Sequence, residues 1–89
     1  MREYMKNILK VLSNNIRSIV ENHMIFFEDN AYEIRLRINS PVNIKSLKGN
    51  YFLDIDKKSL NIPDDYYTIK KNDIDETISC LTLNSIHAF

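Results

Sequence analysis

The sequence is poor in the residues that build several common functional sites: its 89 residues include one glycine, one cysteine, two prolines and no tryptophan. With a single glycine, neither glycine-rich phosphate-binding motif, GxxxxGK[ST] or GxGxxG, can be present. The lone Cys80 cannot form an internal disulfide. No run of about 18 apolar residues occurs, and the first residues lack the apolar core of a signal peptide. A cytoplasmic location is therefore the default expectation.

Charge of neither sign is in excess, since twelve basic and twelve acidic residues cancel. A balanced chain has no global field to attract nucleic acid or an anionic membrane. The hydrophobic content of 44% and the charged content of 27% are typical of a globular domain. We therefore expect residues 1–89 to form a single small domain or a fragment of a larger one.

Apolar residues spaced three and four apart predict a helical layer at the start of the chain: Met5, Ile8, Leu9, Leu12, Ile16, Ile19 and Val20. The sequence Ser13-Asn14-Asn15 interrupts this stripe with side chains that favour caps and turns. The pattern predicts two helices, roughly 2–12 and 14–22, or one helix bent at Ser13. The apolar run Met24–Phe27 fits either the end of the helix layer or a short strand.

The segment "YEIRLRINSP" alternates strictly, which predicts a strand over 32–38 that ends before Pro41. Its predicted core residues are the even ones: Tyr32, Ile34, Leu36 and Ile38. Alternation resumes over 42–45, and a turn at Lys48-Gly49-Asn50 leads into a strand over 51–55. The expected sheet is an antiparallel or mixed β-meander with one buried face and one wet face.

The last third of the sequence predicts a loop over 56–67, a short strand near Ile69 and a helix from Lys71 or Asn72. Asn72 is the expected cap, and Asp73 suits the positive end of the helix dipole. The predicted fold class is therefore α+β, with N-terminal helices, a small meander and a C-terminal helix.

Two arginines on the wet face are the clearest candidates for binding. Arg35 and Arg37 lie two residues apart on the predicted strand, which places them about 6.6–7 Å apart on one face. Their forked donors suit carboxylates or phosphates. Aromatic side chains that could stack on single-stranded RNA are Tyr51, Phe52 and Tyr67. Because Glu33 shares the face of the arginines, the pattern favours a solvated or domain-contacting face over a nucleic-acid platform.

No catalytic set or metal site is predicted. His23 is expected at a helix C-terminus, His87 at a packed helix start and Cys80 as a small apolar residue. The acidic pairs, Asp54 with Asp56 and Asp64 with Asp65, occur in or near predicted loops without EF-hand spacing, which is typical of solvated charge.

Four segments, "YEIRLRINSPVNI", "KGNYFL", "YTIKKNDIDETI" and "LNSIHAF", occur in this order with short gaps. Their succession resembles the N-terminal region of the stage III sporulation protein AA family, bacterial sporulation ATPases similar to the motors of type II and type IV secretion. The matching positions are Glu33 to Arg37, Pro41, Gly49, Tyr51 to Leu53, Asp73, Ile74, Ser85, Ala88 and Phe89. Lys70 departs from the family, which tends to have a helix-capping threonine there, and "MIFFEDNA" resembles an insertion.

The resemblance implies a non-catalytic N-terminal fragment of a larger α/β domain, cut from the ATPase domain at Phe89. ATP and Mg²⁺ would belong to the full-length protein, with no cofactor in this chain. The implied partners are its own ATPase domain, ring neighbours and membrane-bound sporulation channel proteins, in the mother-cell cytoplasm or at its membrane, and a homo-oligomer is a further expectation. The predicted interface residues are Arg35, Arg37, Pro41 and Phe52. The alternative is an autonomous α/β binding module, for single-stranded RNA, that uses Arg35, Arg37 and Phe52.

Overall fold

The computed structural model describes residues 3–27 and 30–87, with side chains over 6–27 and 30–79. Over these residues the elements follow one another as α1 (Glu3–Val11), α2 (Asn14–Phe27), β1 (Ala31–Arg35), β2 (Val42–Ser46), β3 (Gly49–Leu53), β4 (Lys58–Ser59) and α3 (Lys71–His87). The expectations for the side chains of Cys80 and His87, and for Ala88 and Phe89, lie outside the described part.

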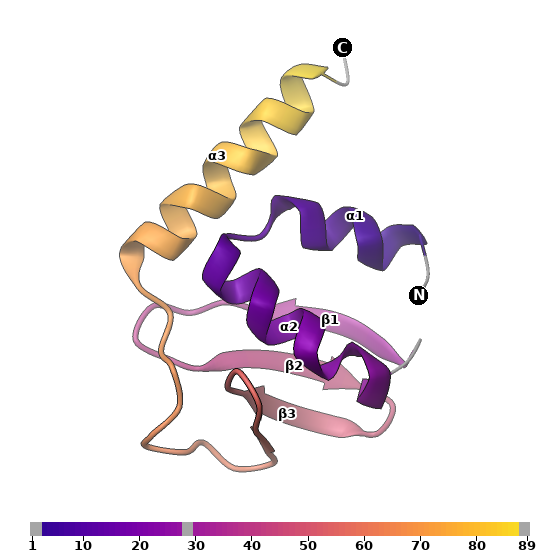
Figure 1. The fold of residues 1–89 in the computed structure, drawn as a ribbon, viewed down its shortest axis with the longest axis vertical. Helices are drawn as coiled ribbons and strands as arrows, with labels where there is room; N and C mark the ends of the chain where they lie inside the picture. The colour runs from indigo at the N-terminus through magenta and orange to yellow at the C-terminus, as the bar shows by residue number, and fades with distance from the viewer. Residues whose placement is uncertain (1–2, 28–29, 88–89) are drawn as a thin grey trace.

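The strands form one antiparallel sheet in the order β1-β2-β3-β4, so the predicted α+β fold with a meander is confirmed. Helix α2 lies across one face of this sheet, and α1 and α3 complete the helical side (Figure 1). No helix of the described residues covers the opposite face, which we call the open face. The C-terminal part of α3 rises away from the rest of the molecule (Figure 1).

The first two helices are separate because α1 ends at Val11 and a new helix begins after Ser13. The Ser13 Oγ accepts a hydrogen bond from the Ile16 amide at 3.4 Å, which caps α2. Arg17 of α2 then donates to the last carbonyls of α1, from Nε to Leu9 O at 2.7 Å and from Nη2 to Lys10 O at 3.1 Å, and to the Leu12 carbonyl between the helices at 2.9 Å. Of the two alternatives for Met24–Phe27, the helix is correct, and α2 runs five residues past the predicted end at 22 (27 − 22).

One cluster of buried apolar side chains holds the helices to the sheet. Because an α-helix or one face of a sheet must bury its apolar side against another element, this cluster determines the layering. Its members come from both N-terminal helices, three strands and the segment before α3: Leu9, Leu12, Ile16, Ile19, Val20, Met24, Phe27, Ala31, Val42, Ile44, Leu53 and Ile69.

The predicted core face of the first strand is wrong at both ends. Tyr32 is 64% exposed and Ile38 is 49% exposed. A β-bulge between Ala31 and Glu33 shifts the alternation, so Ala31 takes the core position and is 1% exposed. The strand ends at Arg35, and Ile38 makes only an isolated parallel bridge to Ile69. Between these ends the pattern holds in part, since Ile34 and Leu36 are half-buried against the core.

The β2–β3 turn and the following loop also differ from the prediction. Residues Leu47 and Lys48 form the turn, because Ser46 already pairs with Gly49. Gly49 therefore opens β3, at a φ of 141° that side-chain-bearing residues rarely adopt. β3 ends at Leu53, and the predicted loop contains the short strand β4, which pairs with β3.

Asp73, and not Asn72, caps α3. The helix begins at Lys71, so Asn72 lies inside its first turn. The Asp73 carboxylate reaches back and accepts a hydrogen bond from the Lys70 amide at 3.0 Å. This is the half of a capping box in which the third helical residue satisfies the amide of the capping residue.

Candidate interface on the open sheet face

The register of the sheet aligns the outward side chains in two rows across the open face. Arg35 pairs with Asn43, which pairs with Phe52. One step along the sheet, Lys45 pairs with both Glu33 and Asn50. Directly paired residues of an antiparallel sheet project from the same face, so both rows point away from the helices.

Beside the first row the surface forms a hollow of about 220 Å³, which we call the arginine hollow. All four predicted interface residues line it: Arg35, Arg37, Pro41 and Phe52. Sequence reasoning missed the other lining residues, Ser40, Asn43, Asn50 and Ile62. Arg37 lies beyond the end of β1, so the two arginines meet at the hollow without sharing a strand. That these residues form an interface stays a prediction.

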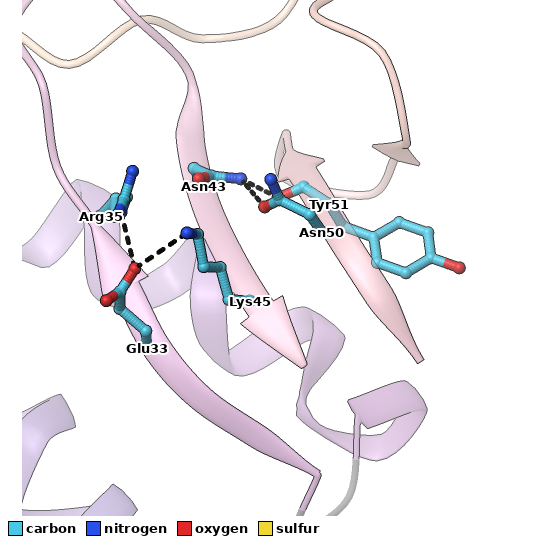
Figure 2. A network of polar contacts seen from close by, with 6 residues as sticks. All are labelled: Glu33, Arg35, Asn43, Lys45, Asn50 and Tyr51. Carbon is cyan, nitrogen blue, oxygen red and sulfur yellow. Dashed lines mark hydrogen bonds and ion pairs between the residues drawn. The ribbon is translucent and has the colours of Figure 1, made fainter. Parts of the chain in front are cut away.

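The two arginines differ in their surroundings. Arg35 Nε donates to Glu33 Oε2 at 2.6 Å, and Lys45 Nζ lies 3.7 Å from the same oxygen (Figure 2). The hydrogen bond from Arg35, together with both positive charges, lowers the pKa of the Glu33 carboxyl despite a smaller opposing effect of desolvation. Within the described part of the chain, the Arg37 side chain has no ion pair or hydrogen bond. Of the two arginines, Arg37 is therefore the one whose guanidinium is unpaired and available to a negatively charged group of a ligand.

A hydrogen bond between the side chains of Asn43 and Asn50 orders the part of the open face next to Arg35. Asn43 Nδ2 donates to Asn50 Oδ1 at 2.6 Å and to the Tyr51 carbonyl at 2.9 Å (Figure 2). This amide contact joins β2 to β3 on the open face. It does not use the Asn50 Nδ2 donors, and Asn50 is one of the residues that line the arginine hollow.

The three aromatic side chains considered for RNA stacking do not share a surface. Only Phe52 lines the arginine hollow. The Tyr51 ring packs on the helical side, with its centroid 5.4 Å from Phe26 and 5.6 Å from Phe27. The Tyr67 hydroxyl donates to the Asp73 carboxylate. Tyr51 and Tyr67 also both pack in part against the buried core, so two of the three rings are engaged inside the fold.

A second polar cluster, which sequence reasoning also missed, lies where α3 meets the corner between α1 and α2. Asp73 is 1% exposed, and its Oδ1 accepts from Ser13 Oγ and Asn15 Nδ2, each at 3.3 Å. Its Oδ2 accepts from Tyr67 and Lys70. The Ser13 amide donates to Thr77 Oγ1 at 3.1 Å. We call this set, Ser13, Asn15, Tyr67, Asp73 and Thr77, the corner cluster.

The titration of the corner cluster follows from these contacts. Desolvation alone would raise the pKa of Asp73, but hydrogen bonds from Tyr67, Lys70, Asn15 and Ser13 outweigh it and lower that pKa. Desolvation and the neighbouring carboxylate raise the pKa of Tyr67. No buried side-chain nitrogen or oxygen of the described residues lacks a hydrogen-bond partner. The buried polar atoms of the corner cluster therefore all have hydrogen-bond partners within the protein, as expected of a cluster that attaches α3 to the other helices.

His23 is a structural residue as well, although not at the predicted place. It lies inside α2, which continues to Phe27, and is 6% exposed. Its Nε2 is 2.7 Å from the Asp54 carbonyl oxygen, which joins α2 to the end of β3. Among the described residues, no group of three or more His, Cys, Asp or Glu side chains could hold a metal ion.

Comparisons with known proteins identify no relative, because no family model, no curated protein and no solved structure matches this chain. Within residues 3–27 and 30–87, no helix has both the length and the apolar character needed to cross a bilayer.

Proposed function

We propose that this chain is the N-terminal docking domain of a secretion-type ATPase that supports the mother cell–forespore channel during endospore formation. The observation that carries the proposal is the ordered series of segments from "YEIRLRINSPVNI" to "LNSIHAF", with its resemblance to the stage III sporulation protein AA family. In the fold, the open face supports a docking role. In the described part of the chain, the helices cover one side of the sheet, and the arginine hollow lies on the other.

The proposed partners are the ATPase domain of the full-length protein, its ring neighbours and membrane-bound channel proteins, met in the mother-cell cytoplasm or at its membrane. ATP and Mg²⁺ would bind to the ATPase domain. The role of this chain would be to hold that domain in place. The residues proposed for this contact are Arg35, Arg37, Pro41 and Phe52.

Protein docking is favoured over the RNA-binding alternative by two features of the open face. Glu33 neutralises part of the charge of Arg35 at 2.6 Å, whereas a phosphate backbone needs unopposed cations. Base stacking needs exposed rings, and of the three considered only Phe52 lines the hollow.

A binding measurement tests the proposal. The reading frame that follows the codon of Phe89 should encode a Walker A loop, and the ATPase domain it encodes should bind residues 1–89 in titration calorimetry. Exchanging Arg35 and Arg37 for alanine should weaken that binding. Lys6→Ala with Lys10→Ala, which removes the same charge from exposed positions of α1, should leave it unchanged.

Two results would overturn the proposal. One is a stop codon directly after Phe89, which would make the chain an independent module. The other is robust Mg²⁺-dependent ATP hydrolysis by residues 1–89 alone, because the sequence has no phosphate-binding loop to support it.

A further inference from the structure

We infer that the arginine hollow binds an acidic segment of a protein partner, with a carboxylate held by Arg37 and Arg35 and an adjacent apolar side chain placed on Phe52 and Ile62. This inference rests on the docking role proposed above and adds the chemistry of the partner. Four features of the open face carry it: the charge of the lining, the fixed position of Arg35, the apolar patch and the size of the hollow.

The lining of the hollow is complementary to a negative group. Arg35 and Arg37 give it two positive charges, and no carboxylate is among the lining residues. Ser40, Asn43 and Asn50 add uncharged polar groups, and the Nδ2 donors of Asn50 are not used in its bond to Asn43. Arginine forks bind carboxylates through paired hydrogen bonds, so this set of donors suits an aspartate or glutamate side chain.

Glu33 acts as a positioning residue for Arg35. Its bond to Arg35 Nε, at 2.6 Å, occupies one side of the guanidinium and leaves the terminal nitrogens for another partner. A fixed guanidinium loses less side-chain freedom when it binds, which raises affinity without a new contact. Glu33 also places a negative charge beside the hollow, which disfavours a ligand that carries several phosphates more strongly than a single carboxylate.

The rest of the hollow is apolar. Phe52 and Pro41 contribute to its lining, and Ile62 lies at its margin with 70% of its surface exposed. Covering such a side chain with an apolar group removes surface from water, which favours a peptide whose acidic residue is followed or preceded by an apolar one.

The volume also points to side chains. The hollow of about 220 Å³ is smaller than the roughly 300–1,000 Å³ of pockets that hold drug-sized ligands and cofactors. Its size suits one or two side chains of a partner. A neighbouring protein surface, from which a carboxylate and an apolar group project, is the occupant that matches the charge, the apolar patch and the size.

The test is a titration of ¹⁵N-labelled residues 1–89, followed by amide chemical shifts. The probe is a capped peptide of alternating leucine and glutamate, added to millimolar concentration. We expect shifts at the amides of Arg35, Arg37, Asn43 and Phe52. A peptide with glutamine in place of glutamate should cause far smaller shifts, and Arg37→Ala should weaken the leucine–glutamate peptide about tenfold, the effect of losing one charge-assisted hydrogen-bonded pair.

Matched variants separate the specific site from general charge. Lys6→Ala with Lys10→Ala should bind the peptide like the unchanged chain, and Arg37→Lys should recover only part of the affinity, because lysine lacks the fork. Glu33→Gln should leave the fold intact and lose selectivity, so that oligouridine RNA then competes with the peptide.

Three outcomes would overturn the inference: no shifts at the hollow at millimolar peptide, equal shifts with the glutamine peptide, or tighter binding of oligouridine than of the acidic peptide to the unchanged chain. Its failure is distinguishable from failure of the docking role. If the ATPase domain binds residues 1–89 and the Arg35→Ala, Arg37→Ala variant equally well, docking uses another surface. If the peptide binds the hollow but no ATPase domain binds, the chemistry holds and the proposed function is wrong.

Discussion

At Asp73, one buried carboxylate accepts hydrogen bonds from four donors in two separate segments of the sequence, Ser13 and Asn15 in one and Tyr67 and Lys70 in the other. Asp73→Ala removes the acceptor and leaves Ser13 and Tyr67 without their partner in a site that is 1% exposed at its centre. We expect the free energy of unfolding to fall by about 2–3 kcal/mol, the effect of leaving buried donors unpaired. Urea denaturation followed by circular dichroism measures this.

The matched control for that variant is Asp75→Ala, on the same helix at an exposed position. It should change the free energy of unfolding by no more than about 0.5 kcal/mol, as surface substitutions do. Equal effects of the two substitutions would mean that the corner cluster adds no stability.

The same residue predicts a pH dependence. The folded protein lowers the pKa of Asp73 below the ordinary 3.8 through its hydrogen bonds, although desolvation opposes this. A depressed folded pKa stabilises the native state above the unfolded pKa, and the contribution is lost as pH falls through the folded pKa. The difference in unfolding free energy between the unchanged chain and Asp73→Asn should therefore be constant above about pH 5 and shrink below pH 3.8. A difference that grows on acidification would contradict this sign.

Glu33 provides a third residue-scale prediction, on the open face. Its pKa is lowered first by the hydrogen bond from Arg35, and Lys45 contributes less from 3.7 Å. Arg35→Ala should raise the pKa of Glu33 toward its ordinary 4.5, and Lys45→Ala should raise it by a smaller amount. Carboxyl ¹³C titration by NMR measures both. If the two substitutions shift the pKa equally, Arg35 does not hold the carboxylate as the geometry indicates.

At the scale of elements, the start of α3 contains an incomplete capping box. Asp73 accepts from the Lys70 amide, but lysine at the capping position offers no side-chain oxygen to the helix. Lys70→Thr would add that acceptor and should stabilise the protein by about 0.5–1 kcal/mol. Lys71→Thr, one residue inside the helix, is the control and should be slightly destabilising, since threonine is a poorer helix former. Thermal unfolding distinguishes the two; a loss of stability in Lys70→Thr would show that the lysine side chain itself matters there.

The elements show how far the sequence could predict the fold. The helical spacing and the alternation were sufficient to predict the three main helices and the antiparallel meander, because each pattern records which side of the element is buried. They failed at the first strand, where Tyr32 fits the alternation but the bulge gives its core position to Ala31. A bulge depends on pairing with the next strand, so a single strand's pattern cannot reveal it.

The candidate site was predictable to a similar extent. The alternation of inward and outward side chains was enough to name Arg35 and Phe52. The pairing of Asn43 with Phe52 depends on the position of the β2–β3 turn, because a turn sets the register of a hairpin, and the sequence placed that turn too late. Ile62 comes from an irregular loop, and the contact of Ser13 with Asp73 joins residues 60 positions apart. Neither has a local signal in the sequence.

At the scale of the whole molecule, the segment between β4 and α3 has one fully buried side chain, that of Ile69. Ile69 is 0% exposed in the shared core, and its backbone bonds to Asn39 and Ser40, each at 2.8 Å. Ile69→Ala should therefore lower the free energy of unfolding by about 2–4 kcal/mol, because it leaves a cavity where the helices, the sheet and the segment between β4 and α3 meet. Since that core is shared, the loss should appear in one cooperative transition.

Ile62→Ala provides the control for this prediction, because the same residue type lies in the same loop at 70% exposure. It should shift stability by less than about 0.5 kcal/mol. Urea denaturation followed by both tyrosine fluorescence and circular dichroism checks the pair. If the two probes report different transitions in Ile69→Ala, α3 and the segment between β4 and α3 unfold separately from α1, α2 and the sheet. The open face would then hold its arginine hollow only through the strands, and Ile62 would no longer be positioned at its margin.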